Sequence, residues 1–341
     1  MRVLVTGGAG FIGCNAVRRY LDQGWDIVVA DDLSRRGSEK NLAWLQSLPT
    51  ASKLKFHKCD IRDTRQVDAV FREHRGVDAV LHLAAQVAVT TSVTDPRNDF
   101  EVNALGTFNV LEAARAHSPK AAFVYSSTNK VYGGLEHVLV TERNGRWEYE
   151  SQRGGISEAE SLDFHSPYGC SKGAADQYVR DYARIYGMNT VCFRQSCIYG
   201  TRQFGVEDQG WVAWFTIATA VGTPLTIYGD GKQVRDVLFV DDLVDCFTAA
   251  FEKIDRVRGQ VFNIGGGPGN QMSLHELIAK LERFSGKKIP LKYEGWRPGD
   301  QRVFVCDIAK AERELGWRPR VSPDAGVEQL HGWVKQNLDL F

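Results

Sequence analysis

The chain has 341 residues, of which 43% are hydrophobic and 25% are charged, as is ordinary for a globular protein. Its 42 basic and 42 acidic side chains balance, so nothing favours binding to nucleic acid or to an anionic membrane. The sequence has no run of about 18 apolar residues that would predict a membrane span, and its first residues predict a core strand instead of a signal peptide. We therefore expect a cytoplasmic protein with about two domains or one large α/β unit.

Cysteine and histidine usage argues against disulfides and metals. The 7 cysteines are odd in number and include no C-x-x-C pair, which predicts reduced thiols. The 8 histidines show no H-x₃-H spacing, so the sequence predicts no metal site.

The first stretch of the chain has the order that a dinucleotide-binding fingerprint requires. Val3–Val5 predicts a buried strand, and the glycine-rich segment 6–13 leads into a helical pattern. A second apolar run, 27–30, ends at Asp31 and Asp32. Strand, glycine turn, helix, strand and acid follow one another, so we expect a bound dinucleotide.

Three glycines in this turn have separate tasks. Gly7 permits the tight turn, Gly10 lets the backbone approach a pyrophosphate, and Gly13 lets the helix pack close to the strand. The free N–H groups at the helix start then face the phosphates. The segment TGGAGFIG, with Gly-x-x-Gly-x-x-Gly spacing, resembles the extended branch of the short-chain dehydrogenase/reductase superfamily.

The acids after the second strand bear on the choice of cofactor. An acid at this place favours the 2′-hydroxyl of an adenosine ribose, and hence NAD. Arg35 and Arg36 keep NADP open, because a basic side chain there could bind a 2′-phosphate; alternatively both are solvated. We expect NAD.

The next two strands also end at residues suited to a cofactor. Leu54–Cys59 alternates and predicts a third strand that ends at Asp60. The resemblance implies that Asp60 and Ile61 flank the adenine, although a strand-end turn acid is an equal alternative. A fourth strand, 79–83, runs into Ala84, Ala85 and Gln86, whose small side chains would let the ribose and nicotinamide lie against the backbone.

The fifth predicted strand, 121–125, delivers Ser126, Ser127 and Thr128 at its C-terminal end, where open parallel sheets place their chemistry. The preceding helical stretch, 100–116, contains Asn103, which resembles a family asparagine that steadies the active-site backbone. The polar connection from Thr128 to Tyr168 is long, and predicts a functional lid or a mobile insertion. The complete set of predicted cofactor contacts is Gly7, Gly10, Phe11, Ile12, Gly13, Asp31, Asp32, Ser34, Arg35, Asp60, Ile61, Leu83, Ala84, Ala85, Gln86, Asn103, Ser126, Tyr168 and Lys172.

Tyr168 and Lys172 are four positions apart and share one helix face. A tyrosine with an ordinary pKa of about 10 is a poor base, but a neighbouring ammonium and an oxidised nicotinamide should lower that pKa. The phenolate could then take a hydroxyl proton while the adjacent carbon gives up hydride, and Thr128 could hydrogen-bond the same substrate oxygen. We expect Thr128, Tyr168 and Lys172 to be catalytic.

Regular α/β alternation weakens after a sixth strand at 190–194, and Gly-, Trp- and Arg-rich loops suited to a lid follow. Ser273 and Glu276 form a capping-box pattern before a helix that extends to Phe284. We expect a Rossmann-type, doubly wound parallel α/β sheet with a smaller, mixed C-terminal lobe. The expected division is 1–194 together with 237–262 for the NAD-binding domain, and 195–236 together with 263–341 for the substrate lobe.

Six longer segments resemble one particular family within this superfamily. YSSTNKVYG, LDFHSPYGCSKGAADQY, FRQSCIYGTRQFG, DQGWV, GKQVRDVL and DQRVFVCDI resemble the CDP-tyvelose 2-epimerase (equally CDP-paratose 2-epimerase) family. The resemblance implies inversion of C2 of a CDP-hexose with tightly held NAD, and a homo-oligomer, either dimer or tetramer. It also implies that Arg235 and Arg297, on separate loops, converge on the diphosphate.

Two departures from related families carry information. Sugar-nucleotide 4,6-dehydratases have Asp-Glu after the active-site threonine, whereas this chain has Asn129 and Lys130, so we expect no elimination of water and assign both residues to sugar orientation. Related 4-epimerases have asparagine where this chain has Cys197, so another side chain must contact the diphosphate, and the candidates are Gln195, Arg202 and Gln203. The predicted substrate contacts are Thr90, Ser127, Asn129, Lys130, Gln195, Arg202, Gln203, Gln209, Val212, Tyr228, Arg235, Arg297 and Asp300.

A 3-deoxyhexose substrate would constrain the mechanism, because it has no C3 hydroxyl whose oxidation could acidify the C2 proton. We therefore expect oxidation at C2 itself, rotation of the 2-keto sugar, and hydride return to the opposite face. Three alternatives stay open at this point: a UDP-sugar 4-epimerase, a dehydrogenase with exchangeable NAD(P), and a non-catalytic NAD-binding regulator.

Overall fold

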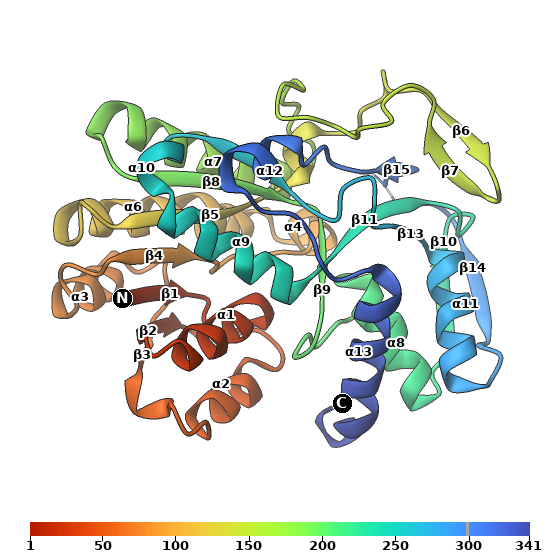
Figure 1. Ribbon diagram of the computed structural model, residues 1–341, viewed down its shortest axis with the longest axis horizontal. Helices are drawn as coiled ribbons and strands as arrows, with labels where there is room; N and C mark the ends of the chain where they lie inside the picture. Colours follow the sequence, from red (N-terminus) through yellow and green to blue (C-terminus); the bar gives the residue numbers. More distant parts are fainter. Residues whose placement is uncertain (298–299) are drawn as a thin grey trace.

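The computed structural model describes residues 1–297 and 300–341 (Figure 1). Its central feature is a seven-stranded sheet in which all neighbouring strands run parallel. The order reverses at β1, as in doubly wound folds, which places a ligand crevice at the carboxyl ends of the strands. In sheet order the strands are β12 (Val261–Ile264), β8 (Thr190–Gln195), β5 (Ala122–Thr128), β4 (Ala79–His82), β1 (Arg2–Thr6), β2 (Asp26–Asp31) and β3 (Leu54–Lys58).

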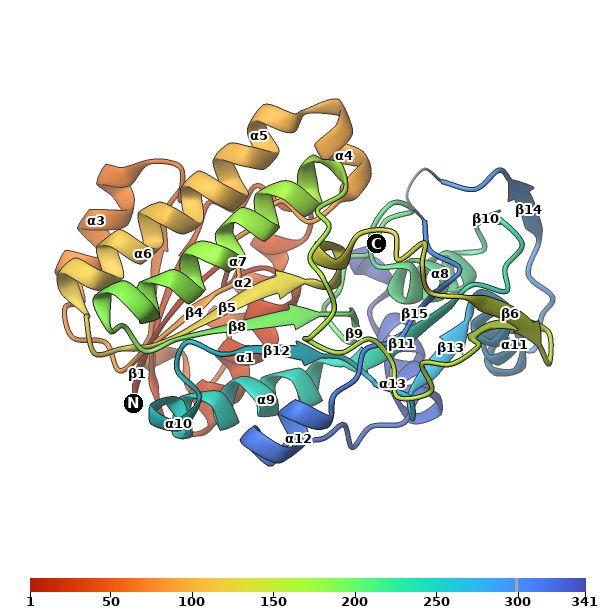
Figure 2. The same ribbon diagram turned by 90° about the horizontal axis from the view of Figure 1, so that it is seen from above.

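Helices cover both faces of this sheet, and each layer has its own apolar core (Figure 2). Such two-sided burial explains why β1, β2 and β4 contain continuous apolar runs, whereas the edge strand β3 alternates. One face carries α1 (Phe11–Asp22), α2 (Ser38–Gln46), α9 (Val240–Glu252), α10 (Ile254–Val257) and α12 (Ala309–Leu315). The other face carries α3 (Thr64–Glu73), α6 (Gly106–His117) and α7 (Ser166–Tyr186).

Three short helical segments precede α6, and the last two run directly into it. They are α4 (Val89–Thr94), α5 (Pro96–Phe100) and a π-helical turn, η2 (Glu101–Leu105). π-Helical turns are rare and often mark functional sites, and this one contains Asn103. Single 3₁₀ turns lie at η1 (Ala51–Lys53), η3 (Asn129–Tyr132) and η4 (Leu338–Leu340).

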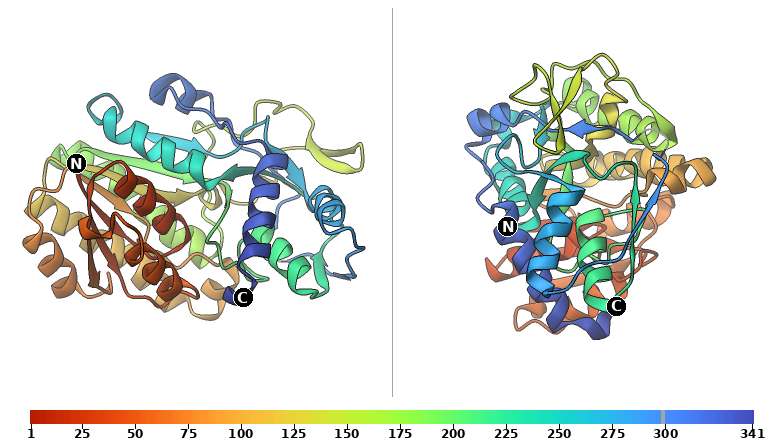
Figure 3. Two further views of the ribbon diagram at one scale, coloured as in Figure 1. Left: turned by 60° about the horizontal axis from the view of Figure 1, so that its bottom comes forward. Right: turned by 90° about the vertical axis from the view of Figure 1, so that its right-hand side faces the viewer.

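A second, smaller lobe packs beside the carboxyl ends of the strands (Figures 1 and 3). Its main sheet consists of β9 (Cys197–Tyr199), β11 (Val234–Phe239), β13 (Gln271–Ser273) and β15 (Val303–Phe304). β10 (Leu225–Tyr228) and β14 (Leu291–Glu294) form a separate parallel pair. The lobe's helices are α8 (Trp211–Val221), α11 (Leu274–Ser285) and α13 (Pro323–Gln336).

Two features of the lobe differ from or extend the sequence expectations. β11 was expected to return to the nucleotide-binding unit, but it pairs with β9, β13 and β15; only α9, which follows it, packs on the central sheet's core. The long connection after Thr128 contains a hairpin, β6 (Val140–Arg143) and β7 (Arg146–Tyr149). Trp147 fixes this hairpin to the lobe, because its ring nitrogen donates to Asp230 at 2.8 Å.

The predicted capping box of α11 is present, with Glu276 N donating to Ser273 Oγ and Ser273 N donating to Glu276 Oε2. A search of the described residues finds no helix with both the length and the apolar character needed to cross a bilayer.

Candidate functional site

A cavity of about 580 Å³ lies at the carboxyl ends of the parallel strands, between the central sheet and the lobe. It brings together residues from the glycine turn, the ends of β2 to β5, the start of α7 and the loop before α8. The predicted residues that line it are Gly7, Gly10, Phe11, Ile12, Gly13, Asp31, Asp32, Ser34, Arg35, Asp60, Ile61, Leu83, Ala84, Ala85, Gln86, Ser126, Ser127, Thr128, Asn129, Tyr168, Lys172, Gln195, Arg202, Gln203, Gln209 and Val212. The predicted residues outside this lining are Thr90, Asn103, Lys130, Tyr228, Arg235, Arg297 and Asp300.

The glycine turn leaves no room for side chains between β1, α1 and the segment after β4. A Cβ on Gly7 would stand 2.7 Å from the backbone nitrogen of Ala84, and Gly7 has a φ of +70°. A Cβ on Gly13 would stand 2.2 Å from the carbonyl oxygen of Gly7. The contact at Gly10 is milder, at 3.2 Å. Gly7 is thus required by backbone conformation, and Gly13 by the approach of α1 to the turn.

The two acids at the end of β2 also shape this turn. Asp31 accepts hydrogen bonds from the backbone N–H groups of Ala9 and Leu33, at 2.9 and 2.8 Å. Asp32 accepts from the backbone and hydroxyl of Ser34, at 2.9 and 2.7 Å. Burial raises the pKa of Asp31. Asp31 therefore holds the turn together, and both carboxylates lie on the cavity wall.

A buried hydrogen-bond network supports the wall next to Tyr168. Asn103 donates to the carbonyl oxygen of Gln86 at 3.0 Å and accepts from its backbone N–H at 2.9 Å. The fully buried Asp99 accepts from the side chains of Gln86, Asn103 and Ser171, at 2.8, 3.1 and 2.5 Å. Asn103 also donates to Ser171. The network joins the segment after β4, the π-helical turn and α7 into one unit.

Sequence reasoning identified Asn103 in this network but missed Asp99, Ser171 and Ser92, whose hydroxyl accepts from the backbone N–H of Tyr168 at 3.1 Å. An acid within a helical pattern usually indicates a solvated face. The spacing of Asp99 and Asn103, four positions apart on one helical face, was the signal available.

The Tyr168 hydroxyl lies in a desolvated environment. Burial raises the pKa of Tyr168 to about 12, while hydrogen bonding with Thr128 and the charge of Arg35 act to lower it. In the chain without its cofactor, desolvation of the phenolate outweighs the nearby positive charge. The expected lowering includes the charge of an oxidised nicotinamide, so it stays a prediction for the protein with NAD bound.

Lys172 also differs from the simple picture of an ammonium directed only at the tyrosine. Its Nζ donates to the carbonyl oxygen of Ser126 at 2.6 Å and lies 4.4 Å from the ring centre of Tyr125. Burial lowers the pKa of Lys172 to about 8. The ammonium therefore links α7 to the end of β5 and holds Thr128 and Tyr168 on neighbouring elements.

Three buried polar atoms on the lobe side of the cavity have no hydrogen-bond partner among the described residues: Gln195 Nε2, Gln203 Oε1 and Trp211 Nε1. Such atoms are costly unless a ligand or water satisfies them. Gln195 and Gln203 were predicted, together with Arg202, as substitutes for the missing asparagine at Cys197, whereas Trp211 was not singled out. The Arg202 guanidinium lies 4.1 Å from the ring centre of Trp44. The half-buried Cys197 lies on the same wall, and burial raises the pKa of its thiol.

The two arginines expected at a diphosphate are each paired with an acid. Arg235 Nη2 lies 2.5 Å from Asp300 Oδ1. Arg297 Nη2 lies 2.9 Å from Asp208 Oδ1, and its guanidinium stacks over the ring of Tyr228 at 3.9 Å. Asp300 pairs with Arg235 in this way, and its predicted contact with substrate stays a prediction.

Other predicted substrate contacts are engaged within the protein. Ser127 donates to the buried Asp176 at 2.9 Å, and Lys130 Nζ lies 3.5 Å from Gln301 Oε1. Arg35 hydrogen-bonds Gln209, which joins the loop after β2 to the loop before α8 across the cavity.

Comparison with known proteins extends over nearly the whole chain. A CDP-paratose 2-epimerase of Salmonella typhi is 46% identical over 339 residues, which are 98% of this chain and 99% of that protein. A crystal structure of UDP-glucose 4-epimerase with UDP-glucose from Thermotoga maritima superposes with a TM-score of 0.84 at 33% identity, covering 99% and 100% of the two chains. The Thermus thermophilus UDP-glucose 4-epimerase in complex with NAD gives 0.82 at 32% identity, with the same coverage. Because the model of the GDP-mannose 4,6 dehydratase family also matches residues 4–330, the chain belongs to that family, within the extended short-chain dehydrogenase/reductase superfamily.

Proposed function

We propose that this protein is an NAD-dependent nucleotide-sugar epimerase that inverts C2 of a CDP-hexose of the paratose or tyvelose type. The observation that carries the proposal is one cavity that joins a dinucleotide cradle to Thr128, Tyr168 and Lys172 without a carboxylate beside Thr128. The 46% identity with CDP-paratose 2-epimerase suggests the sugar and the cytosine base of the substrate.

The residues present fit NAD. Gly7, Gly10 and Gly13 line the cavity at the start of α1, where a pyrophosphate would be bound. Asp31 and Asp32 stand on the wall where a ribose hydroxyl would be bound. A structural neighbour is named as a complex with NAD. Asp60 and Ile61 would flank the adenine, and Ala84 and Gln86 would face the nicotinamide end.

The acids of the cavity argue for epimerisation and against elimination of water. Among the described residues that line it, the carboxylates are Asp31, Asp32 and Asp60, at the ends of β2 and β3. In sheet order, β4 and β1 separate these strands from β5, which carries Thr128. Asn129 lines the cavity beside Thr128, and an amide cannot exchange protons as a dehydratase carboxyl pair does.

The chain's own residues would manage the proton and the orientation of the sugar. Tyr168 Oη takes the proton of the C2 hydroxyl as C2 becomes a carbonyl, and returns it to the epimeric alcohol. Bound NAD supplies the hydride acceptor and donor. Thr128 hydrogen-bonds the same oxygen, and Lys172 holds the end of β5 against α7. Between the two half-reactions the 2-keto sugar turns about its diphosphate, which Gln195, Gln203 and Trp211 would hold through their unpaired atoms.

A UDP-sugar 4-epimerase is the second candidate, because UDP-glucose 4-epimerases share the fold over the full chain. The cavity's catalytic residues serve either position of oxidation. A dehydrogenase with exchangeable NAD(P) would differ by net turnover of cofactor. A non-catalytic regulator is disfavoured, because a sensor of NAD has no use for a tyrosine and a lysine held together at the nicotinamide end.

We also propose that the chain assembles as a homo-oligomer. Four aromatic side chains on the segment from α5 to α6 and on the neighbouring α7 are exposed: Phe100, Phe108, Tyr178 and Tyr186. A second copy would remove this apolar surface from water. Light scattering of the purified protein tests the mass directly.

Proton NMR of the purified protein with CDP-paratose in D₂O, without added NAD, tests the function. The C2 epimer with its C2 proton retained would support both the resident cofactor and oxidation at C2. Deuterium at C2 would retain the epimerase and refute direct hydride return. No reaction with CDP-paratose, together with turnover of a UDP-hexose, would favour the 4-epimerase.

A further inference from the structure

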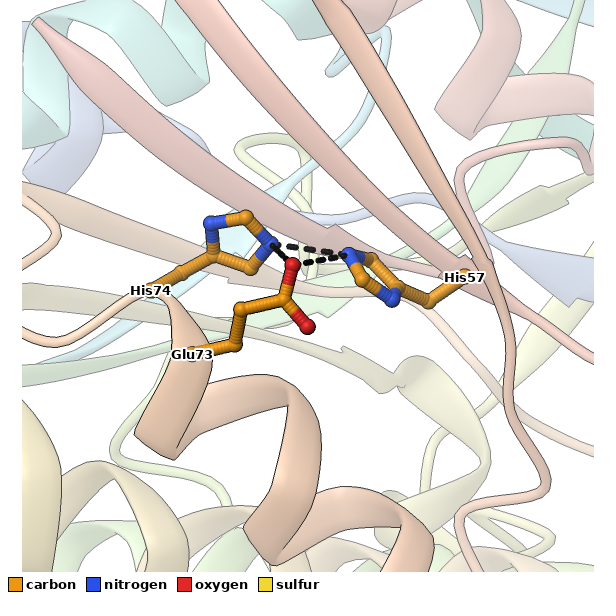
Figure 4. Close-up of side chains that lie close together, drawn as sticks. All are labelled: His57, Glu73 and His74. Carbon is orange, nitrogen blue, oxygen red and sulfur yellow. Dashed lines mark hydrogen bonds and ion pairs between the residues drawn. The ribbon is translucent and has the colours of Figure 1, made fainter.

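Three side chains with metal-ligating atoms meet on the far side of β3, outside the cavity described above. His57 comes from β3, Glu73 is the last residue of α3, and His74 caps that helix (Figure 4). The Nε2 atoms of the two histidines are 2.8 Å apart, and Glu73 Oε1 lies 3.9 Å from His57 Nε2 and 3.6 Å from His74 Nε2. This is the one group of three such residues found in residues 1–297 and 300–341.

The convergence depends on where α3 ends. Successive side chains on a helix point about 100° apart, so adjacent residues rarely face one ligand. His74 has left helical geometry, with φ of −110° and ψ of 39°, and its imidazole can therefore turn toward the carboxylate of Glu73. The two histidine side chains are only 24% and 14% exposed, whereas Glu73 is 63% exposed. The imidazoles are thus held in place by their surroundings, and the carboxylate faces the open side.

The distances match the needs of a small cation. Bonds of about 2.0–2.1 Å in a tetrahedral arrangement separate neighbouring ligand atoms by about 3.3 Å. The three observed separations bracket this value, so side-chain rotations alone would bring the ligands to bonding distance. Imidazole nitrogen with carboxylate oxygen suits Zn²⁺, Ni²⁺ or Cu²⁺, whereas Mg²⁺ and Ca²⁺ prefer oxygen ligands alone.

We propose that His57, Glu73 and His74 form a binding site for one divalent transition-metal ion of the Zn²⁺ class, with water in the fourth position on the exposed side of Glu73. The site ties β3, the outer strand of the central sheet, to the end of α3. Because Asp60 and Ile61 follow β3 and line the cavity, the ion would stiffen the adenine end without touching the reacting atoms.

Some charges around the three side chains favour a bound cation, and others oppose it. The carboxylate of Glu73 and the negative end of the α3 dipole favour a cation. Arg2 and Lys55 oppose it, since their charges act on His74.

The sequence predicted no metal site, because His57 and His74 are 17 positions apart and match no local ligand spacing. The ligands meet only through the packing of α3 beside β3. Tertiary placement, not a motif, creates the cluster.

Calorimetric titration of chelator-treated full-length protein with ZnCl₂ tests the site. The protein should carry Cys170→Ser, because Cys170 is an exposed thiol, and a thiolate is a metal ligand that would compete with the proposed site. We expect one ion per chain, binding at least about tenfold weaker in His57→Gln and His74→Gln, and a zinc-dependent rise in Tm that both variants lose. Glu73→Gln, which changes only an exposed side chain, should also weaken binding and serves if a histidine variant fails to fold.

His137→Gln is the matched control, because His137 faces a single carboxylate, Glu160, at 3.4 Å. It should bind zinc as tightly as the parent. Equal affinity in the parent and in the His57, Glu73 and His74 variants would overturn the proposal, as would the absence of binding below millimolar zinc. Neither result depends on whether the protein proves to be an epimerase.

Discussion

The chemistry proposed for the cavity depends on how single buried charges are balanced. Burial disfavours the charged form of both groups, so it raises the pKa of Tyr168 to about 12 and lowers the pKa of Lys172 to about 8. The carboxylate of Asp99 acts on both, since it raises the pKa of Tyr168 and that of Lys172. The proton transfer proposed for this site would therefore depend on Asp99 as well as on Tyr168 and Lys172, and Asp99 was not recognised in the sequence.

Replacing Tyr168 by phenylalanine should abolish turnover and spare cofactor binding. The hydroxyl is the group that would carry the substrate proton, and loss of such acid–base help costs roughly 10²–10⁴-fold, while the ring and the fold remain. Steady-state kinetics with CDP-paratose and NAD content by absorbance measure the two effects. Tyr178→Phe is the control on the same helix, because Tyr178 does not line the cavity. Full activity in Tyr168→Phe would refute the assignment.

Asp99→Asn should move the pH profile of kcat toward acid. The substitution removes the negative charge that raises the pKa of Tyr168 and of Lys172, so both limbs shift to lower pH. It also disturbs the bonds to Gln86 and Ser171, and we expect kcat to fall about ten- to a hundredfold. Asp95→Asn, at the exposed start of α5, is the control. A fall in kcat with an unmoved profile would assign Asp99 a purely structural role.

At the scale of elements, the glycine turn is the clearest link between local sequence and function. Gly13→Ala would place a Cβ 2.2 Å from the carbonyl oxygen of Gly7, so α1 must move away from the turn that cradles the pyrophosphate. We expect loss of bound NAD and a Tm lower by several degrees, for a cost of about 1–3 kcal/mol. Gly269→Ala is the control, since a Cβ there meets nothing within 4 Å. Retention of NAD by Gly13→Ala would contradict this account of the turn.

Elements with a local signature could be predicted from the sequence. The strand at Val3–Val5, the fingerprint turn and the capping box at Ser273 all follow from neighbouring residues. The partners of β11 could not, because strand pairing across the lobe is fixed by distant residues. For the same reason the pairing of Arg235 with Asp300 escaped prediction. The residues of the candidate site that belong to a local motif could be predicted from the sequence. Those that packing brings to the site, such as Asp99, could not.

For the whole molecule, the cavity is where the central sheet and the lobe meet, and contacts across this junction hold the two together. Asn15 of α1 donates to the carbonyl oxygen of Thr201 at 3.0 Å. Asp242 accepts from the backbone N–H groups of Arg320 and Val321, at 3.0 and 2.9 Å, which fixes the segment before α13. The junction buries charged groups that a fold built for stability alone would leave in water, so the site should reduce the free energy of unfolding at neutral pH.

Lys130 offers a test of that cost. Burial, together with the charge of Arg235, lowers the pKa of Lys130 to about 8, whereas an unfolded chain has a lysine pKa of about 10.4. Between these two pH values the unfolded state binds more protons than the folded state, so the free energy of unfolding rises with pH. When the pH falls again from about 10.4 through about 8, this gain in the free energy of unfolding is lost.

Lys130→Met removes the titration and keeps most of the side chain's volume. We therefore expect the variant to be more stable than the parent at pH 7 by about 2 kcal/mol, and the difference to shrink toward zero near pH 10. Urea denaturation at the two pH values measures it, with Lys287→Met, at an exposed position, as the control. If the difference between parent and Lys130→Met were the same at both pH values, the buried ammonium would carry no such cost. If the variant gained stability while losing turnover, the same side chain would be shown to trade stability for a place at the junction where the sugar is expected.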